Sequence, residues 1–169
     1  MDAELQGQDE GLTLPAVAPP VAVRFQRLDG NPDLPLPEYA TAGAAAFDLR
    51  AAVAPGSVQM LQPGARVLVE TGFAVAVPDG HEMQIRPRSG LALNHGVTVL
   101  NTPATIDSDY RGPLRICLIN LGTAPFTIRR GDRVAQAIVS PVTHVQIVEA
   151  TTLDGTARGD GGFGSTGIA

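Results

Sequence analysis

Residues 66–86 read RVLVETGFAVAVPDGHEMQIR, and this stretch decides the class of fold. Apolar residues come in short runs, and Pro78-Asp79-Gly80 forms a turn signal before the last of them. Short runs with proline and glycine between them are typical of strands joined by tight turns. We therefore predict strands at Arg66–Glu70, Phe73–Val77 and Glu82–Arg86.

The same pattern extends in both directions from this stretch. The chain of 169 residues has 19 glycines and 14 prolines, which excludes long helices, and only Ser89–Asn94 is predicted as a short helix. Many short strands with regular turns predict one all-β domain, a sandwich or a jelly roll. The further predicted strands are Val21–Arg27, Phe47–Ala51, Val97–Leu100, Leu114–Asn120, Phe126–Ile128, Val134–Val139 and Val145–Glu149.

Two of these strands, LRICLIN at 114–120 and VAQAIV at 134–139, are apolar beyond simple alternation. A pattern of this kind indicates that both faces of the strand are covered. The second cover is either another subunit or the interior of the sandwich, and the pattern fits both.

The charged residues and the cysteine count exclude several functions. The formal net charge is −5, and all 12 basic residues are arginines. Without lysine, the chain is neither a Walker-type phosphate-loop protein nor a Schiff-base enzyme. Its one cysteine, Cys117, excludes a disulfide framework and the zinc site of the base deaminases. Because there is no basic excess, we expect no nucleic-acid partner.

The first 20 residues differ from the rest. They contain four acidic residues, three prolines and no arginine, which predicts a flexible acidic tail. They lack the basic start and apolar core of a secretory signal. No apolar run in the chain approaches the roughly 20 residues that span a bilayer. We therefore expect a soluble cytoplasmic protein with no membrane partner.

The turn Pro87-Arg88-Ser89-Gly90 lies between a predicted strand and the predicted helix. Backbone N–H groups, the Ser89 hydroxyl and Arg88 can together cradle phosphate oxygens. The alternative is an ordinary helix cap with a surface arginine.

Residues 101–112 read NTPATIDSDYRG and combine two aspartates, a tyrosine and an amide in one turn-rich stretch. An aspartate here can act as the general base for a water molecule. Tyr110 can pack against a sugar, and Asn101 can read the edge of a base. The alternative is a hairpin turn with solvated aspartates.

The C-terminal stretch RGDGGFG at 158–164 matches a dinucleotide motif only formally, since that motif must follow a strand and open a helix. An arm that carries Phe163 and Arg158 can close over a base and a phosphate. The alternative is a glycine-rich linker.

Two polar residues lie within predicted strands. Asp48 in AFDLRA either faces solvent or orders the water shell of a metal ion. Gln136 interrupts VAQAIV and needs a hydrogen-bond partner, which is either the backbone or a ligand.

Together these stretches resemble the five ordered motifs of the trimeric deoxyuridine triphosphatases (dUTPases), and the resemblance covers residues 21–167. The chain differs from the family pattern at Ala46, Ala104 and Pro113, and a positive φ at Ala104 would strain the hairpin. The matching stretches are AGAAAFDLRA (42–51), PRSGLALNHGV (87–97), NTPATIDSDYRG (101–112), RGDRVAQAIV (130–139) and RGDGGFGSTG (158–167).

This resemblance implies a β-clip-like jelly roll that forms a homotrimer with shared active sites. It implies hydrolysis of dUTP to dUMP and pyrophosphate with Mg²⁺. The chain would divide into the acidic tail (1–20), the β domain (21–150) and a glycine-rich arm (151–169) that closes over a neighbour's site.

The resemblance also implies residue roles at the reacting end of the substrate. Asp107 matches the base that activates the attacking water, and Tyr110 matches the residue under the deoxyribose. Asp48 matches an outer-shell partner of magnesium-bound water. Asn101 and the backbone of Thr105, Ile106 and Asp107 would hold the uracil.

The remaining matched residues would contact the phosphates or close the site. Arg115 matches a lesser substrate contact, and Phe163 would stack on uracil. The phosphate contacts would be Arg88, Ser89, Gly90 and Gln136, with Arg158, Ser165 and Thr166 at the distal phosphates.

Two alternative functions fit the same fold. A dCTP deaminase would need a catalytic glutamate in the hairpin region, and residues 101–112 contain none. A non-catalytic nucleotide-binding or regulatory trimer would not need Asp107, Tyr110, Gln136 and Phe163 together in one chain.

Overall fold

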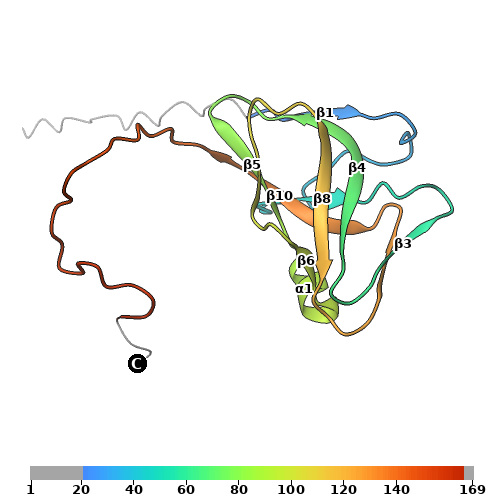
Figure 1. Cartoon of the computed structure of the whole chain (residues 1–169). Coiled ribbons are helices and arrows are strands. Elements are labelled where there is room, and N and C mark those ends of the chain that lie inside the picture. The colour runs from blue at the N-terminus through green and yellow to red at the C-terminus, as the bar shows by residue number, and fades with distance from the viewer. Residues whose placement is uncertain (1–20, 166–169) are drawn as a thin grey trace, which may run out of the picture.

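The fold is seen in a computed structural model that describes residues 21–165, so the predicted acidic tail and Thr166 lie outside the described residues. Most of the body is two four-stranded antiparallel sheets, ordered β1-β4-β8-β6 and β2-β10-β5-β7, with a third, two-stranded sheet of β3 and β9 (Figure 1). The elements are β1 (Arg24–Arg27), β2 (Phe47–Arg50), β3 (Val58–Leu61), β4 (Arg66–Ala76), β5 (His81–Arg86), α1 (Ser89–His95), β6 (Val97–Val99), β7 (Ala104–Ile106), β8 (Pro113–Asn120), β9 (Phe126–Arg129) and β10 (Arg133–Pro141).

One apolar core lies between the two larger sheets. Successive side chains of a strand point to opposite faces, so every second residue of β8 is buried: the apolar Leu114, Ile116 and Leu118, and the polar Asn120 at its end. The apolar ones pack with buried residues of the other sheet, such as Leu49 and Ile85, in a single cluster. The prediction of an all-β jelly-roll domain is confirmed, and the short helix is also present.

Some predicted strands differ from the observed ones. The two runs predicted at 66–70 and 73–77 form one strand, β4, whose register against β8 shifts between Glu70 and Ala74. Gly72 lies in this irregular part with φ of 80°, and a Cβ there would lie 2.9 Å from the Asn31 side chain. The glycine therefore lets the strand continue through a bulge instead of ending.

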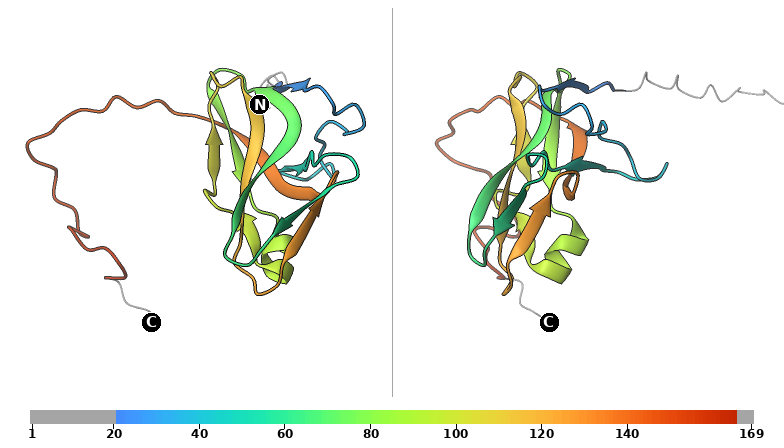
Figure 2. Two further views of the ribbon diagram at one scale, coloured as in Figure 1. Left: turned by 45° about the vertical axis from the view of Figure 1, so that its right-hand side comes forward. Right: turned by 90° about the vertical axis from the view of Figure 1, so that its right-hand side faces the viewer.

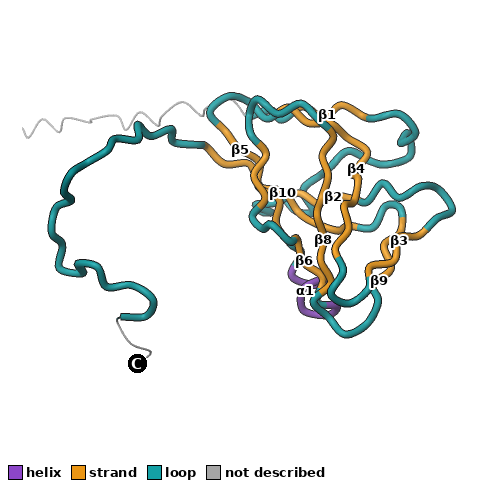
Figure 3. Tube along the Cα trace, in the orientation of Figure 1, coloured by secondary structure: helices purple, strands orange, loops and turns teal. Residues whose placement is uncertain are grey.

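The short strands β3 and β7 were not predicted, and the strand predicted at Val145–Glu149 is wrong for this single chain. Those residues belong to a segment, 142–160, in which every residue is exposed and none is in a strand. The segment leaves the body after β10, as further views show (Figure 2), and is drawn as loop throughout (Figure 3). A strand needs a partner, and within residues 21–165 this segment has none. Among these residues, no helix is long and apolar enough to cross a membrane.

Arg130, in the turn between β9 and β10, fastens that turn to the loop before β2. Its guanidinium donates to Asp33 at 2.6 and 2.7 Å, to Asn31 Oδ1 at 3.2 Å and to the Val53 carbonyl at 2.9 Å. This hydrogen-bonded arginine lowers the pKa of Asp33 from 3.8 to about 2. The contact fixes the start of β10, which carries Gln136 three residues after Arg133.

Asp33→Asn should therefore lower stability in a pH-dependent way. The pKa of Asp33 is depressed in the folded protein, so its contribution is complete above 3.8 and is lost as pH falls toward about 2. Urea denaturation at a fixed protein concentration should give wild type a higher free energy of unfolding than the variant at pH 7. This difference should become smaller below pH 4. Asp29→Asn, in the same loop, is the matched control. A gap of constant size across this range would contradict the assignment.

Candidate active site

A cavity of about 450 Å³ opens where β2, β10 and β5 lie side by side and α1 begins. The register places Gln136 of β10 opposite both Asp48 of β2 and Arg86 of β5. Side chains of such directly paired residues lie on the same face of the sheet. The cavity is lined by Ala40, Ala44, Ala45, Ala46, Asp48, Arg86, Arg88, Ser89, Gly90, Arg133, Gln136 and Ile138.

Asp48 organises the charges of this cavity. Its Oδ1 lies 3.0 Å from Arg88 Nε, and its Oδ2 accepts a hydrogen bond from Arg133 Nη1 at 3.1 Å. Arg88 Nη1 also donates to the Arg133 carbonyl at 3.0 Å. With Arg86, the lining has three guanidinium groups and one carboxylate. The cavity is therefore basic, although the whole chain is acidic, and suits an anion with several charges.

Three of the predicted motif stretches meet at this cavity, from positions far apart in the sequence. Gln136 Nε2 donates to the Pro87 carbonyl at 2.9 Å, which ties β10 to the turn before α1. The hydrogen-bond partner of the Gln136 side chain is therefore a backbone carbonyl, and the sequence had left open a backbone group or a ligand. The predicted site residues on the cavity are Asp48, Arg88, Ser89, Gly90 and Gln136.

Arg86 and Arg133 also line the cavity and were missed by the sequence analysis. Each stands at one end of a strand, where alternation gives no signal. Only the register of β10 between β2 and β5 brings them to the same place.

The predicted hairpin lies elsewhere on the same chain. Its strand β7 is at the edge of the sheet and pairs with β5, where Ala104 lies opposite Ile85, the residue before Arg86. Ile106 pairs with Met83, about 10 Å along β5 from Arg86, and Asp107 follows Ile106 in the direction away from the cavity. Asp107, Asn101 and Thr105 are exposed, and the cavity lining does not include them.

Tyr110 is held at the base of this hairpin. Its hydroxyl donates to the Pro113 carbonyl at 2.9 Å, and its ring lies against Gly112. Ala104 lies in β7 and does not have a positive φ, since Phe163 is the only non-glycine with one in the part of the chain that the structure describes. The alanine therefore does not cause the backbone strain that a positive φ at this position would cause. Pro113 opens β8, a position where a strand accepts proline. Arg115 is exposed on β8, opposite Glu70 of β4.

Gly112→Ala should destabilise the protein by about 1–3 kcal/mol, the usual cost of overpacking. A Cβ at this position would lie 2.5 Å from the Tyr110 hydroxyl oxygen and 2.7 Å from Cζ. Urea denaturation measures the change. Gly43→Ala is the matched control, because a Cβ there meets nothing within 4 Å. In a Tyr110→Ala background the cost should disappear, and a cost that persists would place the strain elsewhere.

Between residues 151 and 165, the C-terminal segment hydrogen-bonds only within itself, and all of its residues but Gly161 and Gly162 are exposed. Arg158 Nε donates to the Gly161 carbonyl at 2.8 Å, and the Ser165 N–H donates to the Gly162 carbonyl at 3.0 Å. Phe163 is fully exposed, with φ of 47°. Within residues 21–165, nothing from this segment reaches the cavity. Thr166, which was predicted to contact the distal phosphates together with Arg158 and Ser165, lies outside the described residues.

The donor set of the cavity determines how a metal ion can fit. Among the described residues, no group of three or more His, Cys, Asp or Glu is arranged to hold one. Both oxygens of Asp48 already face arginines. Mg²⁺ commonly keeps several waters and binds through substrate phosphates. The residues therefore fit a magnesium ion that arrives on a polyphosphate and meets Asp48 through water.

Comparison with known proteins identifies the family. The sequence model of the dUTPase family matches residues 33–167, which is most of the chain. The chain belongs to the dUTPase family. A relative from Caulobacter vibrioides (strain NA1000 / CB15N), named deoxyuridine 5'-triphosphate nucleotidohydrolase, is 58% identical over 153 residues, which is 90% of this chain and 99% of the relative.

Solved structures show that this dUTPase-family chain has the fold of more distant members. A mutant dUTPase of Staphylococcus bacteriophage 80alpha, with dUpNHpp, has a TM-score of 0.77 at 20% identity, covering 87% of this chain and 99% of the phage chain. A mutant dUTPase of phage phi11 of S. aureus, described with a structural Mg(II) ion, has a TM-score of 0.69 at 19% identity, covering 79% of this chain and 99% of the other.

Proposed function

We propose that the protein hydrolyses dUTP to dUMP and pyrophosphate. The observation that carries this proposal is the basic cavity at which three separate dUTPase motif stretches meet. A sheet register that aligns Asp48, Gln136 and Arg86 builds this cavity in a chain of the dUTPase family. The alternative of a dCTP deaminase is not favoured, since the family match is to dUTPase and the hairpin has no glutamate.

Asp107 is the proposed base. Its carboxylate takes a proton from a water molecule whose oxygen attacks the α-phosphorus. The bond from the α-phosphorus to the bridging oxygen breaks, and pyrophosphate leaves with that oxygen. Asp107 is exposed just after β7, where a substrate bound to another copy of the chain can reach it.

The hairpin around Asp107 is the proposed nucleoside site. Asn101 and the backbone of Thr105 and Ile106 hold the uracil edge, and a site built for that edge rejects cytosine. Tyr110, held by the Pro113 carbonyl and Gly112, packs under the deoxyribose and leaves no room for a 2′-hydroxyl.

The cavity is the proposed phosphate site. The N–H groups and hydroxyl at the start of α1, with the cavity's guanidinium groups, are donors suited to phosphate oxygens. Arg115 is a proposed minor contact, and Phe163 stacks on the uracil when the arm closes. The proposed phosphate contacts are Arg88, Ser89, Gly90 and Gln136, with Arg158, Ser165 and Thr166 at the distal phosphates.

Mg²⁺ is the proposed cofactor, met by Asp48 through water. When bound, the ion would neutralise charge on the triphosphate and orient that group for in-line displacement. Arg88 and Arg133 fix the orientation of the Asp48 carboxylate by binding one oxygen each.

We also propose a homotrimer with shared active sites. Within residues 21–165 of one chain, the cavity lining includes no residue of the hairpin or of the C-terminal segment, so we expect a site that uses all three to need other copies. The arm, proposed to be residues 151–169 after a domain at 21–150, can reach a neighbour because its described part makes only local contacts. The acidic tail at 1–20 and the cytoplasmic location remain predictions from the sequence.

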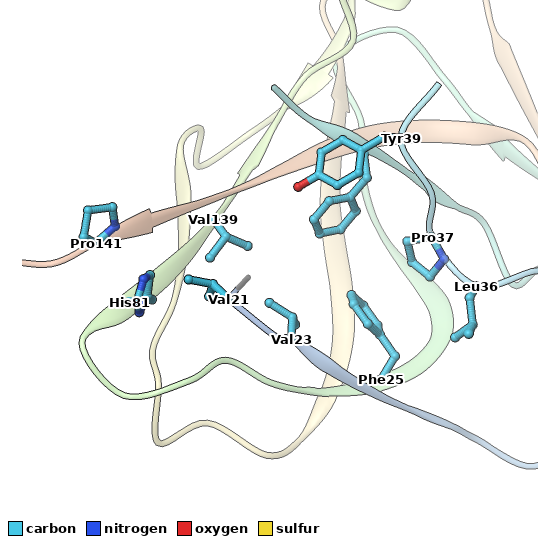
Figure 4. A pocket seen from close by; sticks show the side chains of 10 residues that line it. Val21, Val23, Phe25, Leu36, Pro37, Tyr39, His81, Val139 and Pro141 are labelled. Atoms are coloured by element: carbon cyan, nitrogen blue, oxygen red, sulfur yellow. The ribbon is translucent and has the colours of Figure 1, made fainter. Parts of the chain in front are cut away.

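A second cavity, which is apolar, supports association between copies. It has a volume of about 620 Å³, and its walls include Phe25 of the edge strand β1 and Val23 just before that strand (Figure 4). Val145 and Ile147 are 75% and 93% exposed, in the segment that the sequence predicts as a strand. We propose that Val145–Glu149 of a neighbouring copy covers this cavity, which would bury apolar surface on both partners.

The test of function is incubation of the protein with Mg²⁺ and each deoxynucleoside triphosphate, followed by assays of pyrophosphate and ammonia. Pyrophosphate from dUTP alone is the expected result. Ammonia from dCTP would indicate the deaminase, and binding of dUTP without any product would indicate the regulatory trimer.

Sedimentation velocity tests the assembly. A trimer is expected, and Ile147→Asp should weaken it because the aspartate would be buried in the contact. A monomer at micromolar concentration would exclude the shared site.

A further inference from the structure

Arg86 is one of the two arginines of the phosphate cavity that were not singled out from the sequence. It ends β5 and stands directly before the Pro87-Arg88-Ser89-Gly90 turn. It is exposed and pairs with Gln136. Its guanidinium is therefore on the face of the sheet where the phosphates are proposed to bind.

The three arginines of the cavity have different partners. Arg88 and Arg133 each form an ion pair with Asp48, at 3.0 and 3.1 Å. In the part of the chain that the structure describes, Arg86 has no ion pair. It donates instead to the neutral side chain of Gln84, from Nε at 3.2 Å and from Nη2 at 2.6 Å. Arg86 thus brings to the cavity a positive charge that is not ion-paired among the described residues.

A row of polar side chains on β5 holds this guanidinium in place. Glu82, Gln84 and Arg86 alternate along the strand, so they share one face. Gln84 Nε2 donates to Glu82 Oε1 at 2.6 Å, which leaves the amide oxygen to accept from Arg86. A long arginine side chain loses entropy when it binds a ligand, and fixing it beforehand reduces that loss.

We propose that Arg86 is a further phosphate-binding residue, and that Gln84 and Glu82 position it. This inference rests on the proposed function, because it assigns the polyphosphate of that substrate as the anion. Asp48 forms ion pairs with Arg88 and Arg133, whereas Arg86 supplies a guanidinium that is free of an ion pair among the described residues. Gln84 and Glu82 are positioning residues and do not touch the substrate.

Arg86→Gln should raise the KM for dUTP about tenfold, the usual loss for one hydrogen bond to a charged group, with a smaller change in kcat. Arg86→Lys should restore part of the affinity but not the contact to Gln84, since lysine is a point charge without a fixed fork. Gln84→Leu should raise KM by less than Arg86→Gln. Arg66→Gln is the matched control, because Arg66 is exposed on β4 of the other sheet.

Inorganic tripolyphosphate tests the contact independently of turnover. Calorimetry should show weaker binding to the Arg86→Gln variant than to wild type, and the difference should shrink as salt is added. Equal binding by both proteins, or no binding by wild type, would overturn the assignment of Arg86. The proposed function fails separately, if wild type releases no pyrophosphate from dUTP.

Sedimentation separates the phosphate role from a role in subunit contact. The Arg86→Gln variant should sediment as wild type does. A smaller assembly would show that Arg86 binds a neighbouring copy, and would overturn the proposal.

Discussion

Asp107→Asn should lower the rate of pyrophosphate release from dUTP by about 10²–10⁴-fold, the usual contribution of a positioned base. The amide has the size of the carboxylate but cannot take the proton of the attacking water. Asp107 is exposed and forms no ion pair among the described residues, so the substitution should not disturb the fold. Steady-state assays of pyrophosphate measure the loss.

Asp109→Asn is the matched control for this variant. Asp109 lies two residues further along the same turn and is equally exposed, so it experiences the same loss of charge. It should retain most of the activity. Both variants should bind a non-hydrolysable dUTP analogue as wild type does. If Asp109→Asn is the inactive variant, the two carboxylates of the hairpin have been assigned the wrong way round.

Removal of residues 158–169 should lower kcat/KM for dUTP by about 10²-fold or more. Stacking on a base and one charge-assisted contact to phosphate are together lost, and each is worth a factor of about ten or more. The described residues of this stretch hydrogen-bond only within residues 156–165. The shortened chain should therefore unfold at the same urea concentration as the full chain.

The variants Phe163→Ala and Phe163→Tyr separate the contribution of ring stacking from the rest of the truncation's effect on kcat/KM. The alanine variant should lose the share due to stacking, and the tyrosine variant should keep it because its ring has the same face. An unchanged kcat/KM after truncation would remove the arm from the mechanism. A lower unfolding midpoint would mean that the arm supports the body of a copy instead of closing a site.

Local patterns predicted the features that depend on neighbours in the sequence. The apolar run Leu114–Asn120 predicted a strand, and the structure has β8 there, with one face buried within the single chain. The strand β7 was missed because three residues within a turn-rich stretch carry too little pattern. Its formation depends on pairing with β5, which is a long-range contact.

The candidate site divides in the same way. Gln136 was singled out because a polar residue within an apolar run needs a hydrogen-bond partner, and Ser89 because it lies in a turn between a strand and a helix. Arg86 carried no such signal, because an arginine at a strand end is ordinary. Its position at the cavity follows from a register between strands that are 50 residues apart in the chain. Val145–Glu149 shows the opposite error, since the pattern is that of a strand but one copy offers it no partner.

The separation of the hairpin from the cavity links catalysis to concentration. If no single chain contains a complete site, an isolated copy is inactive, however well it is folded. Specific activity of the proposed trimer would then decline steeply on dilution, since three copies would have to meet to form each assembly. A newly made chain would gain activity only on finding its partners, and the cell's rate of dUTP removal would rise faster than the amount of protein.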